Sequence, residues 1–388
     1  MIPYGRQSIT QADIESVVEV LKSDFLTQGP MVPAFEESLK QKFGCEFAIA
    51  SSNATSALHL SCLALGLGVG DLLWTTPITF VASANCGLYC GARVDFVDID
   101  PVTWNLCPQA LEEKLIEAQL RGDLPKVLVV VHFTGEPCDM LRVNALSKKY
   151  GFSVIEDASH AIGAKYRGEY VGNCRYSDIT VFSFHPVKII TSAEGGAALT
   201  NNPRLADSVR LCRSHGITRD ENLMKKKSDG PWFYQQIALG FNFRMTDIQA
   251  ALGISQLKSL DENICKRRKL VQRYLDLLTE LPLTLPNFDG ENSSAHHLFV
   301  VRVQHEKIGV TRKQVFDFLR EKGIGVNVHY IPVHTQPVYQ SMGFHESDFP
   351  ESMKFYREAL TLPLFPDLSL SEQEHVISSL QQILRGDR

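Results

Sequence analysis

Hydrophobic positions along the chain form short runs that alternate with amphipathic segments. Consecutive apolar residues, as in VLVVV at 127–131, are typical of strands that are covered on both faces. We expect seven such strands, at Phe47–Ser51, Leu72–Thr75, Arg93–Val97, Lys126–His132, Ser153–Glu156, Asp178–Ser183 and Gly196–Thr200. Because segments with helical spacing separate most of them, the pattern predicts an α/β fold. We expect an α/β/α sandwich around a mostly parallel seven-stranded sheet.

Helical spacing occurs before, between and after these strands. Residues 11–22 have Ile14, Val17, Val18 and Leu21 on one face, with Thr10 placed as an N-cap. Further helices are predicted at 32–43, 82–90, 246–260 and from there to about residue 281. The charged segment 219–230 interrupts the pattern and predicts a mobile surface loop.

The last third of the chain has the pattern of a smaller α+β unit. After a connection at 282–294, we expect strands at 297–303 and 326–329, and helices at 312–322, 351–360 and 371–385. A chain of 388 residues exceeds the size at which one core usually stops growing. We therefore predict a large domain at 1–250 and a small C-terminal α+β domain at 251–388.

Composition excludes several classes of protein. A net charge of −5 gives no general attraction to nucleic acid or to an anionic membrane. The N-terminus lacks the features of a signal peptide, and no apolar run reaches the ~18 residues of a membrane span. Nine scattered cysteines indicate a reducing compartment, so we expect a cytoplasmic protein. Cys86 and Cys90 are four residues apart on a predicted helix, where packing is favoured over a metal site, and we expect no metal.

Lys188 is the first candidate for chemistry. It follows the predicted strand 178–183 in the turn Ser183-Phe-His-Pro-Val-Lys188, which Pro186 keeps from becoming helical. Apolar walls around such a lysine would disfavour its ammonium form and leave an amine able to form a Schiff base with a carbonyl. The alternative is a solvated loop lysine, since lysine is mostly exposed.

Other candidates follow neighbouring strands. Asp157 directly follows the predicted strand at 153–156, with His160 three residues later. Its carboxylate could hold a protonated ring nitrogen or simply cap the next turn. Phe80, after the strand at 72–75, could cover an aromatic ligand or belong to the core. In parallel sheets ligands bind beyond the carboxyl ends of strands, so these side chains are expected to converge.

The run Ser52–Leu58 leads from a strand directly into an apolar helix. Its small and hydroxyl residues Ala54, Thr55 and Ser56 suit a phosphate at a helix N-terminus, although ordinary N-capping uses the same residue types. Ser183 could add its hydroxyl to the same phosphate. A Schiff-base lysine, a carboxylate for a ring nitrogen, a stacking face and a phosphate site are together the requirements of pyridoxal 5'-phosphate.

Ordered motifs along almost the whole chain resemble those of one family. They are LTQGP (26–30), SSNATSALHL (51–60), TTPITFVASAN (75–85), VDID (97–100), EDASHAIGA (156–164), SFHPVK (183–188) with EGG (194–196), RSHGI (213–217), GFNFRMTDIQAALG (240–253) and VHYIPVH (328–334). The sequence is identified by them as a member of the DegT/DnrJ/EryC1/StrS sugar aminotransferases, which have fold type I of the pyridoxal-phosphate enzymes.

The resemblance implies a role for each matching residue. Lys188 forms the Schiff base and moves protons, Asp157 holds the pyridine nitrogen, and His160 lies near the phenolic oxygen. Phe80 covers the ring. The phosphate is bound by residues of two turns and of a second subunit, namely Ala54, Thr55, Ser56, Ser183 and the partner subunit's Asn242. The last of these implies a homodimer with shared active sites.

The resemblance also implies a substrate class. Within the family the sequence is most similar to enzymes that move an amino group from L-glutamate to C4 of a UDP-linked 4-keto-6-deoxy-N-acetylhexosamine, towards pseudaminic acid. Candidates for the nucleotide-sugar side are Arg6, Thr27, Gly29, Arg213, His329 and His334, of which the two histidines could equally be structural. Two alternatives stay open: a family member acting on another dTDP- or UDP-linked keto sugar, and a non-catalytic pyridoxal-phosphate-binding regulator.

Overall fold

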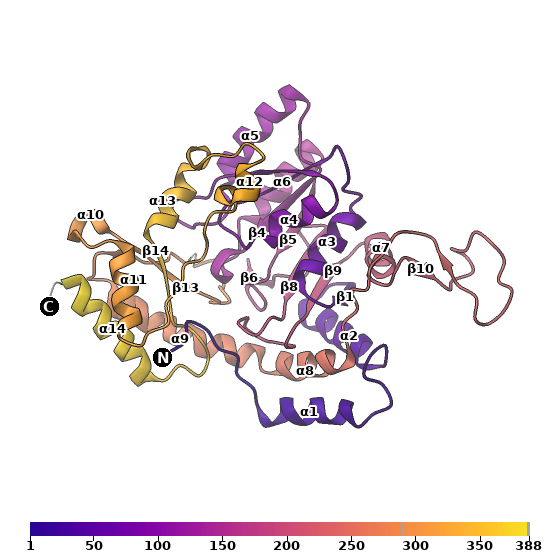
Figure 1. Cartoon of the computed structure of the whole chain (residues 1–388), viewed down its shortest axis with the longest axis horizontal. Coiled ribbons are helices and arrows are strands. Elements are labelled where there is room, and N and C mark those ends of the chain that lie inside the picture. The colour runs from indigo at the N-terminus through magenta and orange to yellow at the C-terminus, as the bar shows by residue number, and fades with distance from the viewer. Residues whose placement is uncertain (289, 386–388) are drawn as a thin grey trace.

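A seven-stranded sheet forms the centre of the computed structural model, which describes residues 1–288 and 290–385 (Figure 1). Its strands, in the order β1-β9-β8-β5-β4-β2-β3, are β1 (Phe47–Ser51), β9 (Gly196–Thr200), β8 (Ile179–Ser183), β5 (Ser153–Asp157), β4 (Val127–Val131), β2 (Leu72–Thr75) and β3 (Arg93–Phe96). Strand β9 runs antiparallel to both of its neighbours, whereas all other pairs are parallel. The predicted sheet is confirmed, and every predicted strand end lies within one residue of the observed one.

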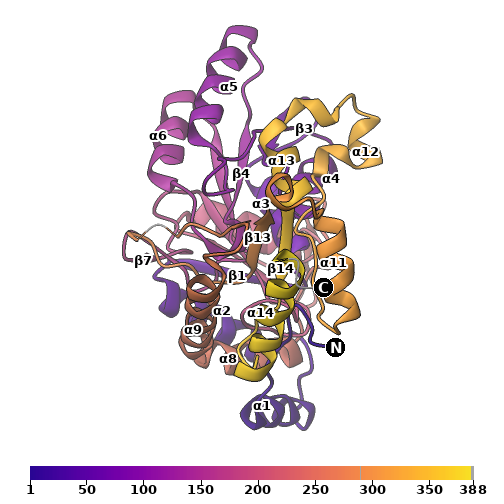
Figure 2. The same cartoon turned by 90° about the vertical axis from the view of Figure 1, so that its left-hand side faces the viewer.

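Helices cover both faces of the sheet. Helices α3 (Ala54–Ala64), α4 (Ala82–Tyr89) and α7 (Pro203–Arg213) share a core with alternate strand residues such as Val127 and Val129. On the opposite face, α5 (Pro108–Arg121) and α6 (Met140–Tyr150) pack on Leu128 and Val130. Figure 2 shows α5 and α6 on one side of β4 and α4 on the other. This is the predicted α/β/α sandwich.

Helix α1 (Gln11–Leu21) forms where the sequence predicts it, with Thr10 and Asp13 in a capping box. Its predicted apolar face, however, does not enter the core of the chain. Ile14, Val18 and Leu21 are exposed, whereas the helix buries Asp13 and Val20. The reason is that polar side chains anchor α1 on α8 (Asp247–Lys258), and Gln256 Nε2 donates to Asp13 Oδ2 at 2.7 Å.

The C-terminal part builds a second, smaller sheet from β12 (Leu283–Thr284), β13 (Phe299–Val303) and β14 (Ala359–Leu362). Helices α9 (Leu260–Leu278), α11 (Arg312–Glu321) and α14 (Leu370–Arg385) share its core. Of the predicted connection 282–294, residue 289 lies outside the described residues. The division into domains at residue 250 stays a prediction.

The predicted strand at 326–329 is wrong. Only Asn327 pairs there, in an isolated bridge to Thr361. The next backbone N–H, that of Val328, donates to the side chain of Asn327 instead of a ladder partner. Strand β14 was not predicted, because the periodicity of α13 (Pro350–Glu358) runs into it.

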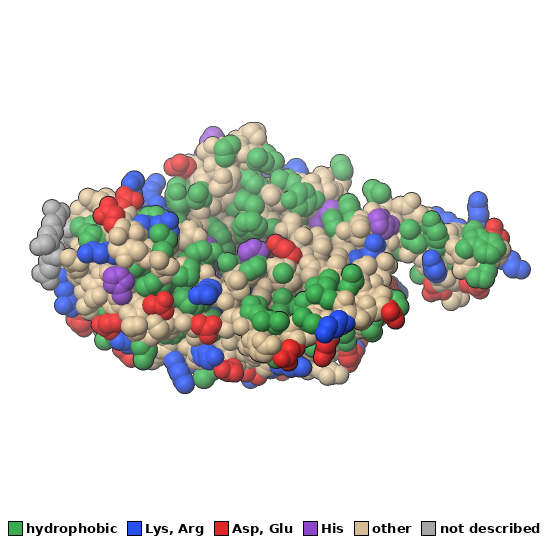
Figure 3. Space-filling model, turned by 60° about the horizontal axis from the view of Figure 1, so that its bottom comes forward, with side chains coloured by type: hydrophobic (Ala, Val, Ile, Leu, Met, Phe, Trp, Pro, Cys, Tyr) green, Lys and Arg blue, Asp and Glu red, His purple; other side chains and the backbone are tan. Residues whose placement is uncertain are grey.

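The charged segment 219–230 lies on an arm that stands clear of the rest of the chain (Figures 1 and 3). The arm begins and ends in a hairpin of β10 (Ile217–Thr218) and β11 (Gln235–Gln236). It exposes the large apolar side chains Leu223, Trp232 and Tyr234.

Most of the remaining elements are short. The short elements are β6 (Lys165–Tyr166), β7 (Glu169–Tyr170), α10 (His305–Ile308) and α12 (Pro337–Gln340), whereas α2 (Met31–Phe43) packs against β1 and α8 and shares a core with them. Within the described residues, no helix has both the length and the apolar character that a membrane span requires.

Candidate active site

A cavity of about 1090 Å³ opens beyond the carboxyl ends of the central strands. Segments after β1, β2, β5 and β8 line one part of it, and residues 327–330 of the C-terminal part close it. Nine of the predicted site residues line this cavity, namely Ala54, Thr55, Ser56, Phe80, Asp157, His160, Ser183, Lys188 and His329.

Lys188 enters the cavity from the turn after β8. Its backbone N–H donates to His185 O at 2.9 Å, which closes the turn that contains Pro186. Desolvation lowers the pKa of the Lys188 amine to about 8, although the negative charge of Asp157 acts in the opposite direction. Among the described residues, no hydrogen bond or ion pair engages this amine. The amine of Lys188 is therefore not held in place as a structural cation.

Asp157 is the last residue of β5 and is 5% exposed. Its Oδ2 accepts a hydrogen bond of 2.6 Å from Ser83 Oγ of α4, and its Oδ1 accepts one of 3.1 Å from Ser159 N. The carboxylate thus both caps the following turn and lines the cavity. Ser83, which the sequence did not single out, is itself 2.7 Å from Thr79 Oγ1 and fixes the direction of this carboxylate.

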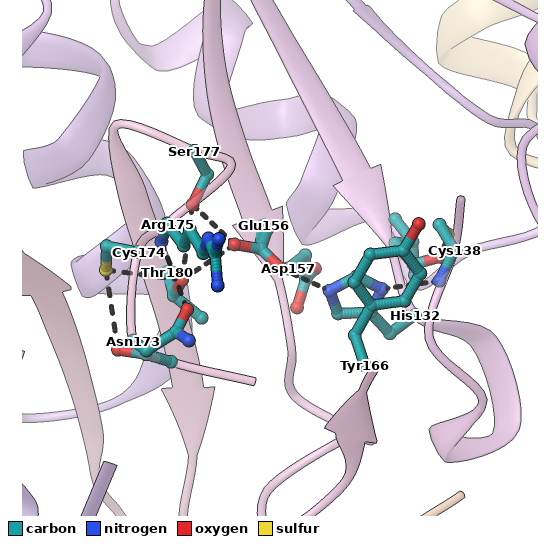
Figure 4. Close-up of polar contacts among 12 residues, drawn as sticks. His132, Cys138, Glu156, Asp157, Tyr166, Asn173, Cys174, Arg175, Ser177 and Thr180 are labelled. Carbon is teal, nitrogen blue, oxygen red and sulfur yellow. Dashed lines mark hydrogen bonds and ion pairs between the residues drawn. The ribbon is translucent and has the colours of Figure 1, made fainter. Parts of the chain in front are cut away.

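A polar network lies behind Asp157, on the other face of β5 (Figure 4). Glu156 accepts hydrogen bonds from Ser177, from Thr180 at 3.1 Å, and from His132 Nε2 at 2.8 Å. Nδ1 of His132 accepts a bond from a backbone N–H, so its proton lies on Nε2. Burial raises the pKa of Glu156, but these hydrogen bonds outweigh it and leave the pKa below its usual value. The network thus links the residue that follows β4 with β5 and with the start of β8.

His160 faces the cavity and contacts two side chains that the sequence did not indicate. Its Nε2 is 3.0 Å from Tyr330 Oη, and its ring centroid is 4.4 Å from that of His297. Burial, together with the nearby charge of Lys188, holds the pKa of His160 well below its usual value. Its Nδ1 is buried and has no partner among the described residues. In the sequence, Tyr330 lies in the motif VHYIPVH (328–334), whereas His297 lies in none of the motifs.

The turn after β1 forms a cup of hydroxyl groups. Asn53, not a hydroxyl residue, caps α3, because its Oδ1 accepts from Ser56 N at 2.8 Å. The side chains of Thr55 and Ser56 are therefore not needed as the N-cap, and both line the cavity with Ser183. A Cβ added at Gly196 would lie 2.5 Å from the backbone of this turn. Glycine thus allows β9 to approach the cup closely.

Asn242 does not line the cavity of its own chain. It is exposed and forms an isolated bridge with Ser214, although its neighbours Phe241 and Phe243 both line the cavity. A single chain therefore leaves Asn242 available to another molecule.

Only one of the six nucleotide-sugar candidates lines the cavity of a single chain. This is His329, whose Nδ1 is 2.9 Å from Thr361 Oγ1 and whose pKa is lowered to about 3 by burial and by the charge of Lys188. Arg6 and Thr27 are exposed outside it. Gly29 donates its N–H to Asp247 Oδ2 at 2.8 Å.

Arg213 and His334 have structural surroundings. Arg213 forms an ion pair of 2.6 Å with Glu36. His334 is fully buried beside the rings of Phe96 and Phe349, and neither of its ring nitrogens has a hydrogen-bond partner among the described residues.

The cavity fits pyridoxal phosphate. It places an amine of lowered pKa, a fixed carboxylate and a hydroxyl cup in one space, and the unpartnered His160 Nδ1 needs an acceptor or donor that a bound group would supply. In the part of the chain that the structure describes, no group of three or more His, Cys, Asp or Glu residues is arranged to hold a metal ion. The fold and the site together are those of a pyridoxal phosphate-dependent enzyme.

Comparison with known proteins gives the family. Residues 7–381 match the DegT/DnrJ/EryC1/StrS aminotransferase family, and the chain belongs to it. It is 36% identical to the spore coat polysaccharide biosynthesis protein SpsC of Bacillus subtilis, covering 99% of this chain and 97% of that protein. It is 37% identical to the UDP-4-amino-4,6-dideoxy-N-acetyl-beta-L-altrosamine transaminase of Campylobacter jejuni, covering 99% and 98%.

Two solved structures show the same fold over the whole chain. One is Helicobacter pylori PseC, an aminotransferase involved in the biosynthesis of pseudoaminic acid, with a TM-score of 0.89, 31% identity and 99% of each chain covered. The other is the PLP form of the putative sugar aminotransferase Spr1654 from Streptococcus pneumoniae, with a TM-score of 0.88, 27% identity and 99% of each chain covered.

Proposed function

We propose that this aminotransferase moves an amino group from L-glutamate to C4 of a UDP-linked 4-keto-6-deoxy-N-acetylhexosamine, giving UDP-4-amino-4,6-dideoxy-N-acetyl-β-L-altrosamine. One observation carries the chemistry: Lys188, with its lowered pKa, and Asp157 line the same cavity. Similarity to the Campylobacter transaminase and to PseC, both over nearly the full length, supports the choice of substrate.

The residues of the site would bind the cofactor and transfer protons. Pyridoxal phosphate supplies an electron sink for the bond that breaks at the carbon bearing the amino group. Asp157 would bind the pyridinium proton through a charged hydrogen bond, and Ser83 keeps its carboxylate directed. Lys188 would bind the carbonyl carbon of pyridoxal phosphate covalently. Once the amino donor has displaced it, the neutral amine of Lys188 would take the proton from Cα of the donor. It would then deliver this proton to the C4' carbon of the cofactor.

The hydroxyl cup would bind the phosphate. Thr55 and Ser56 at the N-terminus of α3, together with Ser183, offer donors where the helix dipole favours an anion. Phe80, which is 58% exposed at the cavity wall, offers a flat apolar face.

We further propose a homodimer in which Asn242 completes the partner's phosphate site. Asn242 is exposed in the single chain, and the apolar side chains Ile14, Val18 and Leu21 of α1 are exposed as well. A second copy of the chain would cover apolar surface of this kind, as in other C₂ homodimers.

A donor and acceptor screen tests the proposed reaction. Purified protein with pyridoxal phosphate is incubated with L-glutamate and either UDP- or dTDP-linked 4-keto sugars, and the product stereochemistry is read by NMR. We expect turnover of the UDP-linked N-acetylated sugar, with the new amine at C4. Turnover of only dTDP sugars, or amination at C3, would contradict the substrate proposal.

Absorbance separates an enzyme from a non-catalytic binding protein. The loaded protein should be yellow, and L-glutamate should bleach this colour as the amino group enters the cofactor. Colour that no amino acid changes would contradict transamination itself, whatever the acceptor.

A further inference from the structure

Tyr330 places its phenol against His160 from a segment that is distant in sequence. Its Oη is 3.0 Å from Nε2 of His160, and the two rings are nearly parallel, with an interplanar angle of 23°. Tyr330 belongs to residues 327–330, the C-terminal segment that lines the cavity. The pair therefore lies at the cavity wall, with one partner from each part of the chain.

The hydrogen bond between these rings can form in two ways. Either Tyr330 donates its O–H to Nε2, which leaves the imidazole proton on Nδ1, or Nε2–H donates to the phenol oxygen. Both side chains are uncharged, because burial raises the pKa of Tyr330 and lowers that of His160. A phenol O–H is a stronger acid than a neutral imidazole N–H, and an imidazole nitrogen is a better acceptor than a phenol oxygen. The first arrangement is therefore favoured.

The surroundings of His160 offer nothing that would oppose this arrangement. The groups that face it from the packed elements are Lys188, His297 and His329, of which the two histidines are held neutral by burial. No described residue accepts a bond from its Nδ1 or donates one to it. The position of the ring proton is thus determined by what Tyr330 does at Nε2.

We propose that Tyr330 is a positioning residue that locks His160 in the Nδ1–H tautomer, so that the ring presents a hydrogen-bond donor to the bound cofactor. In Tyr330→Phe the phenol is lost while the ring and its packing are kept. The proton of His160 is then free to move to Nε2, and Nδ1 becomes an acceptor. This inference depends on pyridoxal phosphate as the cofactor but not on the identity of the sugar.

NMR of the cofactor-free protein tests the tautomer directly. The protein is labelled with ¹⁵N-histidine, and His160→Gln identifies the two signals of His160. Wild type should show a protonated Nδ1 and an unprotonated Nε2, whereas Tyr330→Phe should lose this pattern. Tyr274→Phe is the matched control, because Tyr274 Oη also donates a buried hydrogen bond, to Pro363 O at 3.0 Å, outside the cavity. Wild type with protonated Nε2, or an unchanged pattern in Tyr330→Phe, would overturn the proposal.

Cofactor affinity tests the consequence. One hydrogen bond of ~1 kcal/mol corresponds to about a fivefold change in affinity. Tyr330→Phe should weaken pyridoxal phosphate binding by about this factor in equilibrium dialysis, and Tyr274→Phe should not. Equal affinities of Tyr330→Phe and wild type would overturn the link to the cofactor. Neither the NMR measurement nor the affinity measurement uses a sugar. Both therefore test the role of Tyr330 even if the screen for sugar acceptors finds no turnover.

Discussion

The chemistry of Lys188 comes from its surroundings rather than from its residue type. A solvated lysine, with a pKa near ~10.4, has about one neutral amine in a thousand at pH 7.5. With its pKa at about 8, Lys188 has about one in four. Asp157 limits this gain, because its negative charge favours the ammonium form. Burial and the nearby carboxylate thus act in opposite directions on the pKa of this amine.

The rate of Schiff-base formation should follow this pKa. Only the neutral amine attacks, so the rate constant for pyridoxal phosphate binding to cofactor-free protein should rise almost tenfold per pH unit below pH 7. It should level off above about pH 9. Stopped-flow absorbance measures it. Asp157→Asn should move the midpoint to lower pH, since it removes the charge that favours the ammonium. A rate that still rises steeply at pH 10 would show that Lys188 is an ordinary solvated lysine.

Replacing Lys188 by alanine should abolish transamination. The change removes both the covalent attachment and the group that moves the proton, so we expect a loss of at least about 10³-fold in kcat. The fold should persist, because no hydrogen bond of the amine within the described residues is lost. Lys165→Ala is the control: Lys165 lies over the ring of Tyr170 outside the cavity. Substantial residual turnover in Lys188→Ala, checked by circular dichroism for folding, would remove Lys188 from the mechanism.

At the level of elements, close approach of strands shapes the hydroxyl cup. Gly196 of β9 pairs with Ser51 of β1 and with Ser183 of β8, and so lies between two strands that end at the cavity. Its backbone also approaches the turn at Asn53 and Ala54 so closely that no side chain fits between them. The spacing of the cup is therefore set by a residue that contributes no functional group.

Gly196→Ala should damage cofactor binding and stability together. The added Cβ would meet backbone atoms of Asn53 and Ala54 at 2.5 Å, and backbone cannot move aside as a flexible side chain can. We expect a loss of about 1–3 kcal/mol in the free energy of unfolding, measured in urea, and weaker pyridoxal phosphate binding in dialysis. Gly68→Ala is the matched control, since an added Cβ there would meet nothing within 4 Å. Equal stability of the two variants would contradict this account of the cup.

Elements formed by local patterns could be predicted, and contacts between distant segments could not. Short apolar runs between helical segments predicted all seven central strands, and the strand ends then pointed to Lys188 and Asp157. Tyr330 and His297 escaped prediction because their segments reach the cavity only through the packing of the C-terminal part. The strand predicted at 326–329 failed for a related reason: Asn327 satisfies the next backbone N–H with its own side chain, which no periodicity reveals.

At the scale of the whole molecule, one chain exposes several large apolar side chains. The outer face of α1 exposes Ile14, Val18 and Leu21, and Trp232 and Tyr234 are exposed on the arm. Figure 3 shows hydrophobic side chains on this arm. Asn242 lies beside its own cavity without lining it. These features are those expected of a subunit that buries apolar surface and shares residues with a second copy.

Mixed dimers test whether the active sites are shared. As pure proteins, Lys188→Ala should be inactive and Asn242→Ala should be only weakly active. If Asn242 serves the partner's site, a mixed dimer carries both changes in one site and none in the other. Equal mixing and random reassociation give about half mixed dimers, so activity should recover to about a quarter of the wild-type value.

The control for this recovery is a mixture of Lys188→Ala with Asp157→Asn. Both residues line the cavity of the same chain, so each site of a mixed dimer keeps one defect and no activity should return. Activity is measured after denaturation and joint refolding, with wild type treated in parallel to correct for losses. Recovery in both mixtures would point to an artefact of refolding. If neither mixture recovers although mixed dimers are present, Asn242 does not serve the partner's site.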